Sequence, residues 1–144
     1  MFVYLVHHAD AVGPEVDAQR PLSERGRVHA EWLAAQARDR KCAPAAIWHS
    51  GKLRARQTAE PFLRLCSPFA EFKMVRGLQP EDPPAWLRDE LMAESRDVLL
   101  VGHMPHIRAL AHLLSRGTSD LEPHGLVALE RKDGLFESVW RLST

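Results

Sequence analysis

The sequence predicts a three-layer α/β/α sandwich with a mostly parallel central sheet and an antiparallel edge. Two observations lead to this prediction. Short apolar runs alternate with segments of helical periodicity along most of the chain, which is typical of parallel strands joined by helices. Two β-prone runs then follow each other directly, separated by Asp133 and Gly134, a pair that favours a tight hairpin turn. In such sheets, functional sites lie beyond the carboxyl ends of the parallel strands.

The composition indicates one ordinary globular domain spanning residues 1–144. Of the 144 residues, 45% are hydrophobic and 26% are charged, which is enough apolar material for a core without disulfides. The 19 basic residues balance the 19 acidic ones, so we expect no nucleic-acid or membrane partner. No apolar run reaches the length of a membrane helix, and no secretory leader is recognised, so we predict a cytoplasmic protein.

The elements of the first half follow from local patterns. Residues 2–6 form a continuous β-prone run, as expected for a strand buried on both faces. Ser23 is a suitable N-cap for a helix that continues to about Arg40. Residues 45–48 predict a second strand, and helical spacing resumes from Lys52. Pro61 lies inside this second helix and predicts a kink or an early end, because proline lacks the backbone N–H.

The second half predicts four more strands and two more helices. The strands are expected at residues 72–75, 98–101, 126–129 and 136–140. Asp82, followed by two prolines, is a good helix start, since aspartate can cap and proline is tolerated in the first turn. The other helix follows Pro105 and carries apolar residues every three to four positions as far as Leu114.

Histidines follow three of the predicted strands. His7 and His8 come after the first strand, His49 after the second, and His103 after the strand at 98–101. Because parallel strands end at one edge, we expect His8 and His103 to reach a common ligand. Arg54, in the first turn of the helix that follows the second strand, would point toward the same edge of the sheet. A neutral imidazole can attack phosphorus while nearby cations balance the phosphoryl oxygens, so the arrangement predicts phosphoryl transfer.

A metal site is the competing interpretation of the same histidines. Its ligands would come from His7, His8, Asp10, His49, His103 and His106. We expect no metal and no other cofactor, because Arg54 in the same pocket would repel a divalent cation. His49 is expected to be structural, and His106 to form a hydrogen bond near the start of its helix.

Four segments, in order, resemble the successive motifs of the histidine phosphatase superfamily. They are residues 5–10 (LVHHAD), 20–26 (RPLSERG), 50–59 (SGKLRARQTA) and 101–105 (VGHMP). The resemblance covers nearly the whole chain and implies a phosphoglycerate mutase-like fold. The short length and the form of the last motif make the chain most similar to the SixA-type phosphohistidine phosphatases.

The resemblance implies a role for three residues of the predicted site. His8 matches the nucleophile that becomes transiently phosphorylated. Arg54 matches the arginine of the later RAxQTA string, and His103 matches the histidine that hydrogen-bonds a phosphoryl oxygen. The implied partner is a protein carrying phosphohistidine or a small phosphorylated molecule.

One position departs from the family pattern in a way that bears on activity. The family has arginine before the nucleophile, where this chain has His7. We expect His7 to contact substrate, but an imidazole lacks the guanidinium fork and is only partly charged near neutrality. Activity should then decline at a lower alkaline pH than in a His7→Arg variant. Two functions stay open: a phosphatase acting through phospho-His8, and a catalytically impaired module that binds phosphate or phosphoprotein.

The source of the leaving-group proton is also open. Many members of the superfamily carry an acidic residue for this step. Glu81 and Asp82 are the acidic candidates in the corresponding segment of this chain, and Asp82 is equally well explained as a helix cap. Arg20 and Arg25 fit a motif region but are expected at the surface or in a supporting role.

Overall fold

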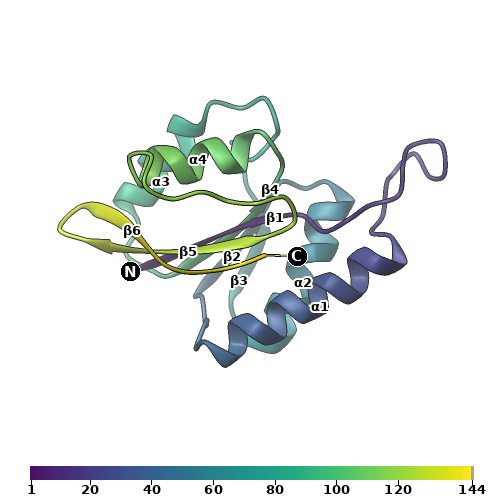
Figure 1. Ribbon diagram of the computed structural model, residues 1–144, viewed down its shortest axis with the longest axis horizontal. Helices are drawn as coiled ribbons and strands as arrows, with labels where there is room; N and C mark the ends of the chain where they lie inside the picture. Colours follow the sequence, from purple (N-terminus) through teal and green to yellow (C-terminus); the bar gives the residue numbers. More distant parts are fainter. Residues whose placement is uncertain (144) are drawn as a thin grey trace.

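A computed structural model describes residues 1–143 as a six-stranded sheet with two helices on each face (Figure 1). The strands are β1 (Phe2–His7), β2 (Ala46–His49), β3 (Glu71–Met74), β4 (Val98–Gly102), β5 (Leu126–Lys132) and β6 (Leu135–Leu142). The helices are α1 (Glu24–Asp39), α2 (Leu53–Cys66), α3 (Pro84–Ala93) and α4 (His106–Leu114).

The strand order is β3-β2-β4-β1-β5-β6. The first four of these strands are mutually parallel, β5 runs antiparallel to β1, and β6 runs antiparallel to β5. Asp133 and Gly134 both have positive φ, 54° and 79°, in the turn between β5 and β6, as a tight hairpin requires. The predicted parallel sheet with an antiparallel edge is confirmed.

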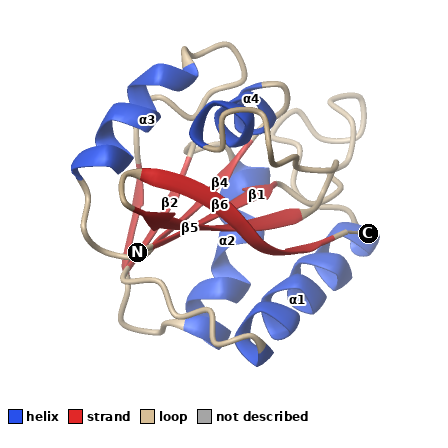
Figure 2. Cartoon of the chain, turned by 60° about the vertical axis from the view of Figure 1, so that its left-hand side comes forward, coloured by secondary structure: helices blue, strands red, loops and turns tan. Residues whose placement is uncertain are grey.

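Two apolar cores, one on each face of the sheet, separate the three layers. Figure 2 shows α3 and α4 on one side of the strands and α1 and α2 on the other. Successive side chains of a strand point to opposite faces, so Leu5 packs in the core with α3 and α4, while Val6 packs in the core with α1 and α2. Both are fully buried. Burial on both faces is why β1 lacks the polar alternation of a half-exposed strand.

Two predicted helix boundaries need correction. α2 does not end before Pro61 but continues to Cys66. Pro61 and Phe62 are both buried, and packing of this face offsets the hydrogen bond that proline cannot make. Asp82 does not cap α3, whose N-cap is Pro83. The Asp82 carboxylate accepts the Gln79 N–H at 2.9 Å and so closes the preceding turn. The Ser23 cap is confirmed, since its hydroxyl accepts the Gly26 N–H.

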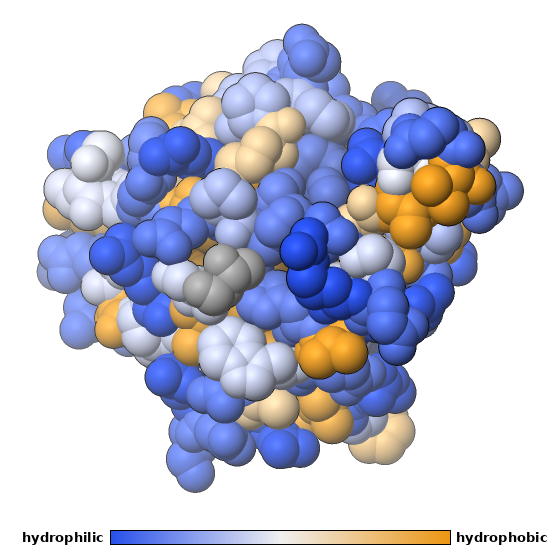
Figure 3. Space-filling model, turned by 45° about the vertical axis from the view of Figure 1, so that its right-hand side comes forward, coloured by the Kyte–Doolittle hydropathy of each residue, from blue (hydrophilic) through white to orange (hydrophobic). Residues whose placement is uncertain are grey.

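The parallel strands end on a polar side of the molecule. Figure 3 turns forward the side toward which β1 runs, and the visible face is mainly hydrophilic, with apolar residues in small separate groups. Among the described residues, no helix combines the length and hydropathy that crossing a bilayer requires. A charged ligand would therefore approach the ends of these strands over a polar surface.

Candidate active site

Three separate stretches of the chain meet at the carboxyl edge of the parallel strands. The ring centroids of His8 and His103 are 5.1 Å apart, and those of His7 and His8 are 4.5 Å apart. All three imidazoles are buried. Burial lowers the pKa of each of them, and the positive charge of Arg54 lowers it further, so the guanidinium lies near enough to act on all three rings. The structure thus brings together the residues that the sequence predicted to share one edge of the sheet.

The loop after β1 is fastened to the start of α2. The backbone N–H of Ala9 donates to Thr58 Oγ1 at 2.9 Å, and the Thr58 hydroxyl donates to the Arg54 carbonyl at 2.8 Å. α2 and α4 begin a few residues after β2 and β4 end, so both helix N-termini lie at the edge that carries the histidines. Helix N-termini favour anions through their free N–H groups and dipole.

His8 has a defined tautomer. Its Nδ1 lies 2.7 Å from the Ala9 carbonyl oxygen. Because a carbonyl can only accept, Nδ1 carries the proton and Nε2 keeps its lone pair. Burial lowers the pKa of His8 to about 4, and Arg54 adds to this against the opposing effect of the Ala9 hydrogen bond. At neutral pH, His8 therefore presents an unprotonated Nε2, as a nucleophile must.

His103 and Arg54 are the two residues that accompany His8 in the predicted site, and each has a buried nitrogen to account for. His103 Nε2 lies 2.6 Å from Ser50 Oγ, which also accepts the Lys52 N–H at 3.3 Å. If the Ser50 hydroxyl donates to Nε2, no hydroxyl proton is left unpaired and His103 carries its proton on Nδ1. Within residues 1–143, His103 Nδ1 and Arg54 Nε are buried and have no hydrogen-bond partner. An oxyanion would satisfy both donors.

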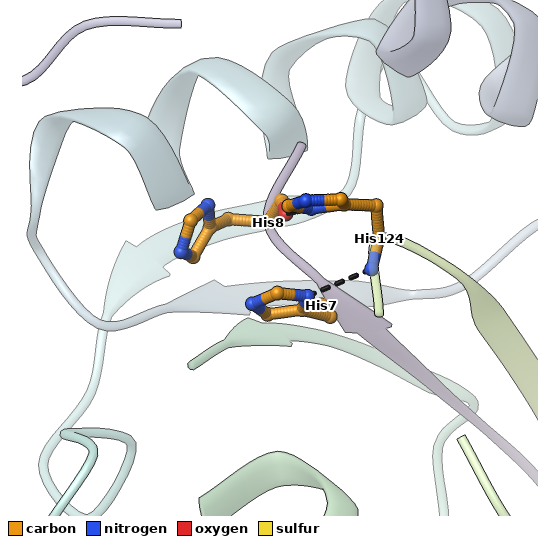
Figure 4. A group of neighbouring side chains, drawn as sticks. All are labelled: His7, His8 and His124. Carbon is orange, nitrogen blue, oxygen red and sulfur yellow. Dashed lines mark hydrogen bonds between the residues drawn. The ribbon is translucent and has the colours of Figure 1, made fainter. Parts of the chain in front are cut away.

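His7 has the opposite tautomer to His8. Its Nδ1 accepts the backbone N–H of His124 at 2.7 Å (Figure 4), so its proton lies on Nε2. Burial, followed by the neighbouring His8, lowers the pKa of His7 to about 3. The expectation of a partly charged His7 near neutrality is therefore wrong. His7 is a neutral N–H donor in the position where the superfamily has a cation.

His124 belongs to the same cluster, and sequence reasoning missed it. Its ring stacks on His7, with centroids 4.7 Å apart and planes 13° apart, and its Nδ1 lies 2.7 Å from the His8 carbonyl oxygen. His124 lies just before β5, the antiparallel neighbour of β1. A histidine immediately before a strand that pairs with β1 was the available signal, but 117 positions separate it from His7.

The ligand set considered for a metal does not assemble. Among the described residues, the group close enough to share an ion is His7, His8 and His124, with one ring nitrogen from each within 4.8 Å of the others. A metal needs a free lone pair from each ligand. The lone pair of His7 is occupied by the His124 N–H, and Arg54 adds a positive charge nearby. These residues do not fit a divalent cation.

The other histidines considered from the sequence lie outside this cluster. His49 is structural as expected, since it is buried and its Nδ1 accepts the Gly51 N–H at 3.0 Å. The expectation for His106 is wrong: within residues 1–143 neither of its buried ring nitrogens has a hydrogen-bond partner.

The remaining charged candidates lie around the site. Arg25 is exposed and pairs with Asp10 at 3.2 Å. Arg20 is half-buried and donates from Nε to the Val12 carbonyl, and its charge lowers the pKa of Arg54, after the larger effect of burial. Glu81 is exposed, and the Asp82 carboxylate accepts the N–H already described, so their role as general acid stays a prediction.

The fold closely matches solved phosphatase structures. The protein histidine phosphatase SixA complexed with tungstate aligns with a TM-score of 0.87 at 22% identity, covering 99% of this chain and 97% of that one. SixA from Agrobacterium tumefaciens aligns with a TM-score of 0.80 at 27% identity, covering 99% and 98%. A phosphoserine phosphatase from Entamoeba histolytica aligns with a TM-score of 0.74 at 15% identity, covering 99% and 97%.

The sequence itself points to the same family. A search of curated protein sequences gave no match. The profile of the histidine phosphatase superfamily (branch 1), in contrast, matches residues 3–79, more than half of the chain, and includes His7, His8 and Arg54. With that match, and with the predicted phosphoglycerate mutase-like fold confirmed by the solved structures, the chain belongs to the histidine phosphatase superfamily and is a phosphatase of that class.

Proposed function

We propose that the protein hydrolyses phosphohistidine, or a small phosphomonoester, through a phospho-His8 intermediate. The observation that carries this proposal is the bond from His8 Nδ1–H to the Ala9 carbonyl. This bond leaves the Nε2 lone pair free in a cluster that also contains the Arg54 guanidinium and the rings of His7 and His103. The reacting nitrogen and the donors for the phosphoryl oxygens are thus prepared before substrate arrives.

Two displacements complete the reaction. In the first, the Nε2 lone pair of His8 bonds to phosphorus while the bond from phosphorus to the leaving atom breaks, and that atom keeps the electron pair. In the second, water attacks phospho-His8, the P–N bond breaks, and Nε2 recovers its lone pair as phosphate leaves. Arg54, His103 Nδ1–H and His7 Nε2–H hold the oxygens in both steps.

Similarity supports phosphohistidine as the substrate class. Two of the structures described above are SixA proteins, and one of them is a protein histidine phosphatase that holds tungstate. Tungstate is a tetrahedral oxyanion, like the phosphoryl group. A protein bearing phosphohistidine is therefore the partner we propose, with a small phosphorylated molecule as the other substrate that the site fits.

The neutral state of His7 favours a second candidate function. With a pKa of about 3, His7 adds no positive charge to that of Arg54 and Arg20, which both act on the nucleophile His8. A site with less positive charge stabilises the transition state less. The alternative is a module that binds phosphate or phosphoprotein without turning it over.

Trapping the phosphoenzyme separates the two functions. The protein is mixed with a small phosphodonor such as phosphoramidate, quenched in base to preserve phosphohistidine, digested and analysed by mass spectrometry. We expect one added phosphoryl group on the peptide that contains His8, together with steady release of phosphate. His8→Asn keeps a side-chain N–H near the Ala9 carbonyl but removes the nucleophile, so neither signal should form.

The matched control is His112→Asn, which removes an exposed histidine on α4 and should leave both signals unchanged. Saturable phosphate binding without a phosphoenzyme would support the binding module instead. A phosphoenzyme that survives in the His8→Asn variant would show that another residue is the nucleophile.

A further inference from the structure

The roles assigned so far place no proton donor beside the leaving group. Arg54, His103 and His7 face the phosphoryl oxygens in the proposed reaction. Glu81 is exposed, and the Asp82 carboxylate already accepts the Gln79 N–H. We propose that His124 is a further catalytic residue, which protonates the leaving atom from Nε2. This inference rests on the proposed phosphatase function and deepens it.

The ring of His124 is held with one nitrogen free. Its Nδ1 donates to the His8 carbonyl at 2.7 Å, and its face stacks on His7. The His124 carbonyl accepts a hydrogen bond from His29 Nε2 at 2.9 Å, which fixes the backbone as well. Since Nδ1 is engaged, Nε2 is the nitrogen left to exchange a proton. Figure 4 shows the rings of His7, His8 and His124 gathered around one space.

A cavity of about 330 Å³ lies next to His124, and its other lining residues are Asp10, Arg25 and His29. His124 therefore lines this cavity and at the same time belongs to the imidazole cluster that contains the nucleophile. Pockets for small molecules begin at about this size. We assign the cavity to the leaving group, an imidazole ring or an alcohol of similar size, because a group seated there borders His124.

The charges around His124 suit a residue that gains and loses a proton. His7 and His8 are neutral neighbours, Arg25 and His29 face it from α1, and Asp10 is the carboxylate of the cavity. The Ser23 hydroxyl lowers the pKa of Asp10, so this carboxylate stays ionised at the wall of the cavity. Imidazole is the side chain that can donate and accept protons between pH 5 and 8.

The proton balance closes over the two displacements. In the first, the His124 imidazolium transfers its Nε2 proton to the leaving atom as the bond to phosphorus breaks. In the second, neutral Nε2 takes a proton from the water that attacks phospho-His8, which regenerates the imidazolium. His124 would thus act as general acid and then as general base.

His124→Asn isolates this role from the structural one. His124 has φ 60°, a left-handed conformation that asparagine tolerates well. Asparagine also places an N–H at the position of Nδ1, so the bond to the His8 carbonyl can persist, and the backbone N–H still binds His7. The variant loses the titrating Nε2 and the stacking of the ring on His7. Inhibition by tungstate should therefore stay within about threefold of the unmodified protein, a threshold below the ~10-fold cost of one net hydrogen bond.

The test compares two substrates of similar size whose leaving groups differ in their need for a proton. The p-nitrophenolate of p-nitrophenyl phosphate can leave without being protonated. The alkoxide that leaves benzyl phosphate, in contrast, requires a proton. Removing a general acid typically costs 10²–10⁴-fold, so we expect His124→Asn to lower kcat/KM for benzyl phosphate about 100-fold and kcat/KM for p-nitrophenyl phosphate little. The ratio kcat/KM reports the first displacement and not the later attack of water on phospho-His8, which both substrates share. The alkaline decline of kcat/KM for benzyl phosphate should also disappear in the variant.

An equal loss of kcat/KM for both substrates would show a merely structural role and overturn the inference, as would an unchanged kcat/KM for benzyl phosphate. The unmodified protein tests the phosphatase function separately. If it hydrolyses p-nitrophenyl phosphate and the ratio of the two rates is the same in both proteins, the inference alone fails. If it hydrolyses neither substrate, the proposed function fails, and the inference with it.

Discussion

Histidines in two regions of the molecule have very different surroundings. At the carboxyl edge of the sheet, His7, His8 and His103 are buried, and their hydrogen-bond partners are a backbone N–H, a carbonyl and a hydroxyl. On α4, the exposed His112 lies 2.8 Å from the carboxylate of Asp120. That carboxylate also accepts two hydrogen bonds from Arg108, at 2.7 and 2.8 Å.

The difference shows how this fold produces a reactive imidazole. A carboxylate partner favours the imidazolium, which has no lone pair to attack phosphorus. Burial with uncharged partners does the reverse and lowers the pKa of all three histidines at the edge. The uncharged partners also decide which nitrogen keeps the proton. His7 and His8 are adjacent in sequence, yet one offers an N–H and the other a lone pair.

The largest effect in this comparison should come from the guanidinium at the edge. Arg54→Gln removes the cation next to the nucleophile, and we expect kcat/KM for p-nitrophenyl phosphate to fall roughly 1,000-fold, the upper range for losing a preorganised donor. Arg108→Gln, which removes an exposed arginine from the α4 cluster, is the matched control and should leave the rate unchanged. A loss below tenfold for Arg54→Gln would contradict its placement beside the phosphoryl group.

A smaller effect is expected from His7→Arg, which exchanges a neutral donor for a charged one. Hydrogen bonds from charged donors are about 1 kcal/mol stronger than neutral ones, so kcat/KM should rise about fivefold.

The pH profiles of kcat/KM for the unmodified protein and for His7→Arg then test the charge state of His7. With its pKa near 3, His7 does not titrate in the working range, so the profiles should superimpose after scaling between pH 6 and pH 9. An earlier alkaline decline in the unmodified protein would show that His7 is cationic near neutrality.

The free energy of unfolding should also depend on pH, because the folded protein keeps buried histidines neutral. Burial holds the pKa of His103 at about 3 against an ordinary value of 6.5. Between these two values the unfolded chain binds a proton that the folded chain does not, so stability is full above pH 6.5 and falls as the pH decreases. From pH 6.5 to 5 this amounts to about 2 kcal/mol for one histidine.

Urea unfolding at the two pH values measures this effect. His103→Asn should lose about 2 kcal/mol less than the unmodified protein over the same interval. Arg38→Gln is the control, since it changes an exposed side chain of α1 and arginine does not titrate in this interval. An unchanged pH dependence in His103→Asn would mean that His103 is not held neutral.

Much of the fold could be predicted from the sequence because its signals are local. The apolar run of β1, the Ser23 cap and the turn at Asp133 and Gly134 each depend on neighbouring residues, and the structure confirms them. The continuation of α2 through Pro61 could not be predicted, because packing of its buried face outweighs the local cost of proline.

The sequence by itself determined the α/β class, the family, and the meeting of His8, Arg54 and His103 at one edge, since strands that run parallel must end together. Only the tertiary structure decided the protonation of His7 and the place of His124. Both depend on the pairing of β1 with β5, which brings a backbone N–H from the far end of the chain onto the His7 ring. A tautomer is set by the hydrogen-bond partner in space, and no local pattern encodes a partner more than a hundred residues away.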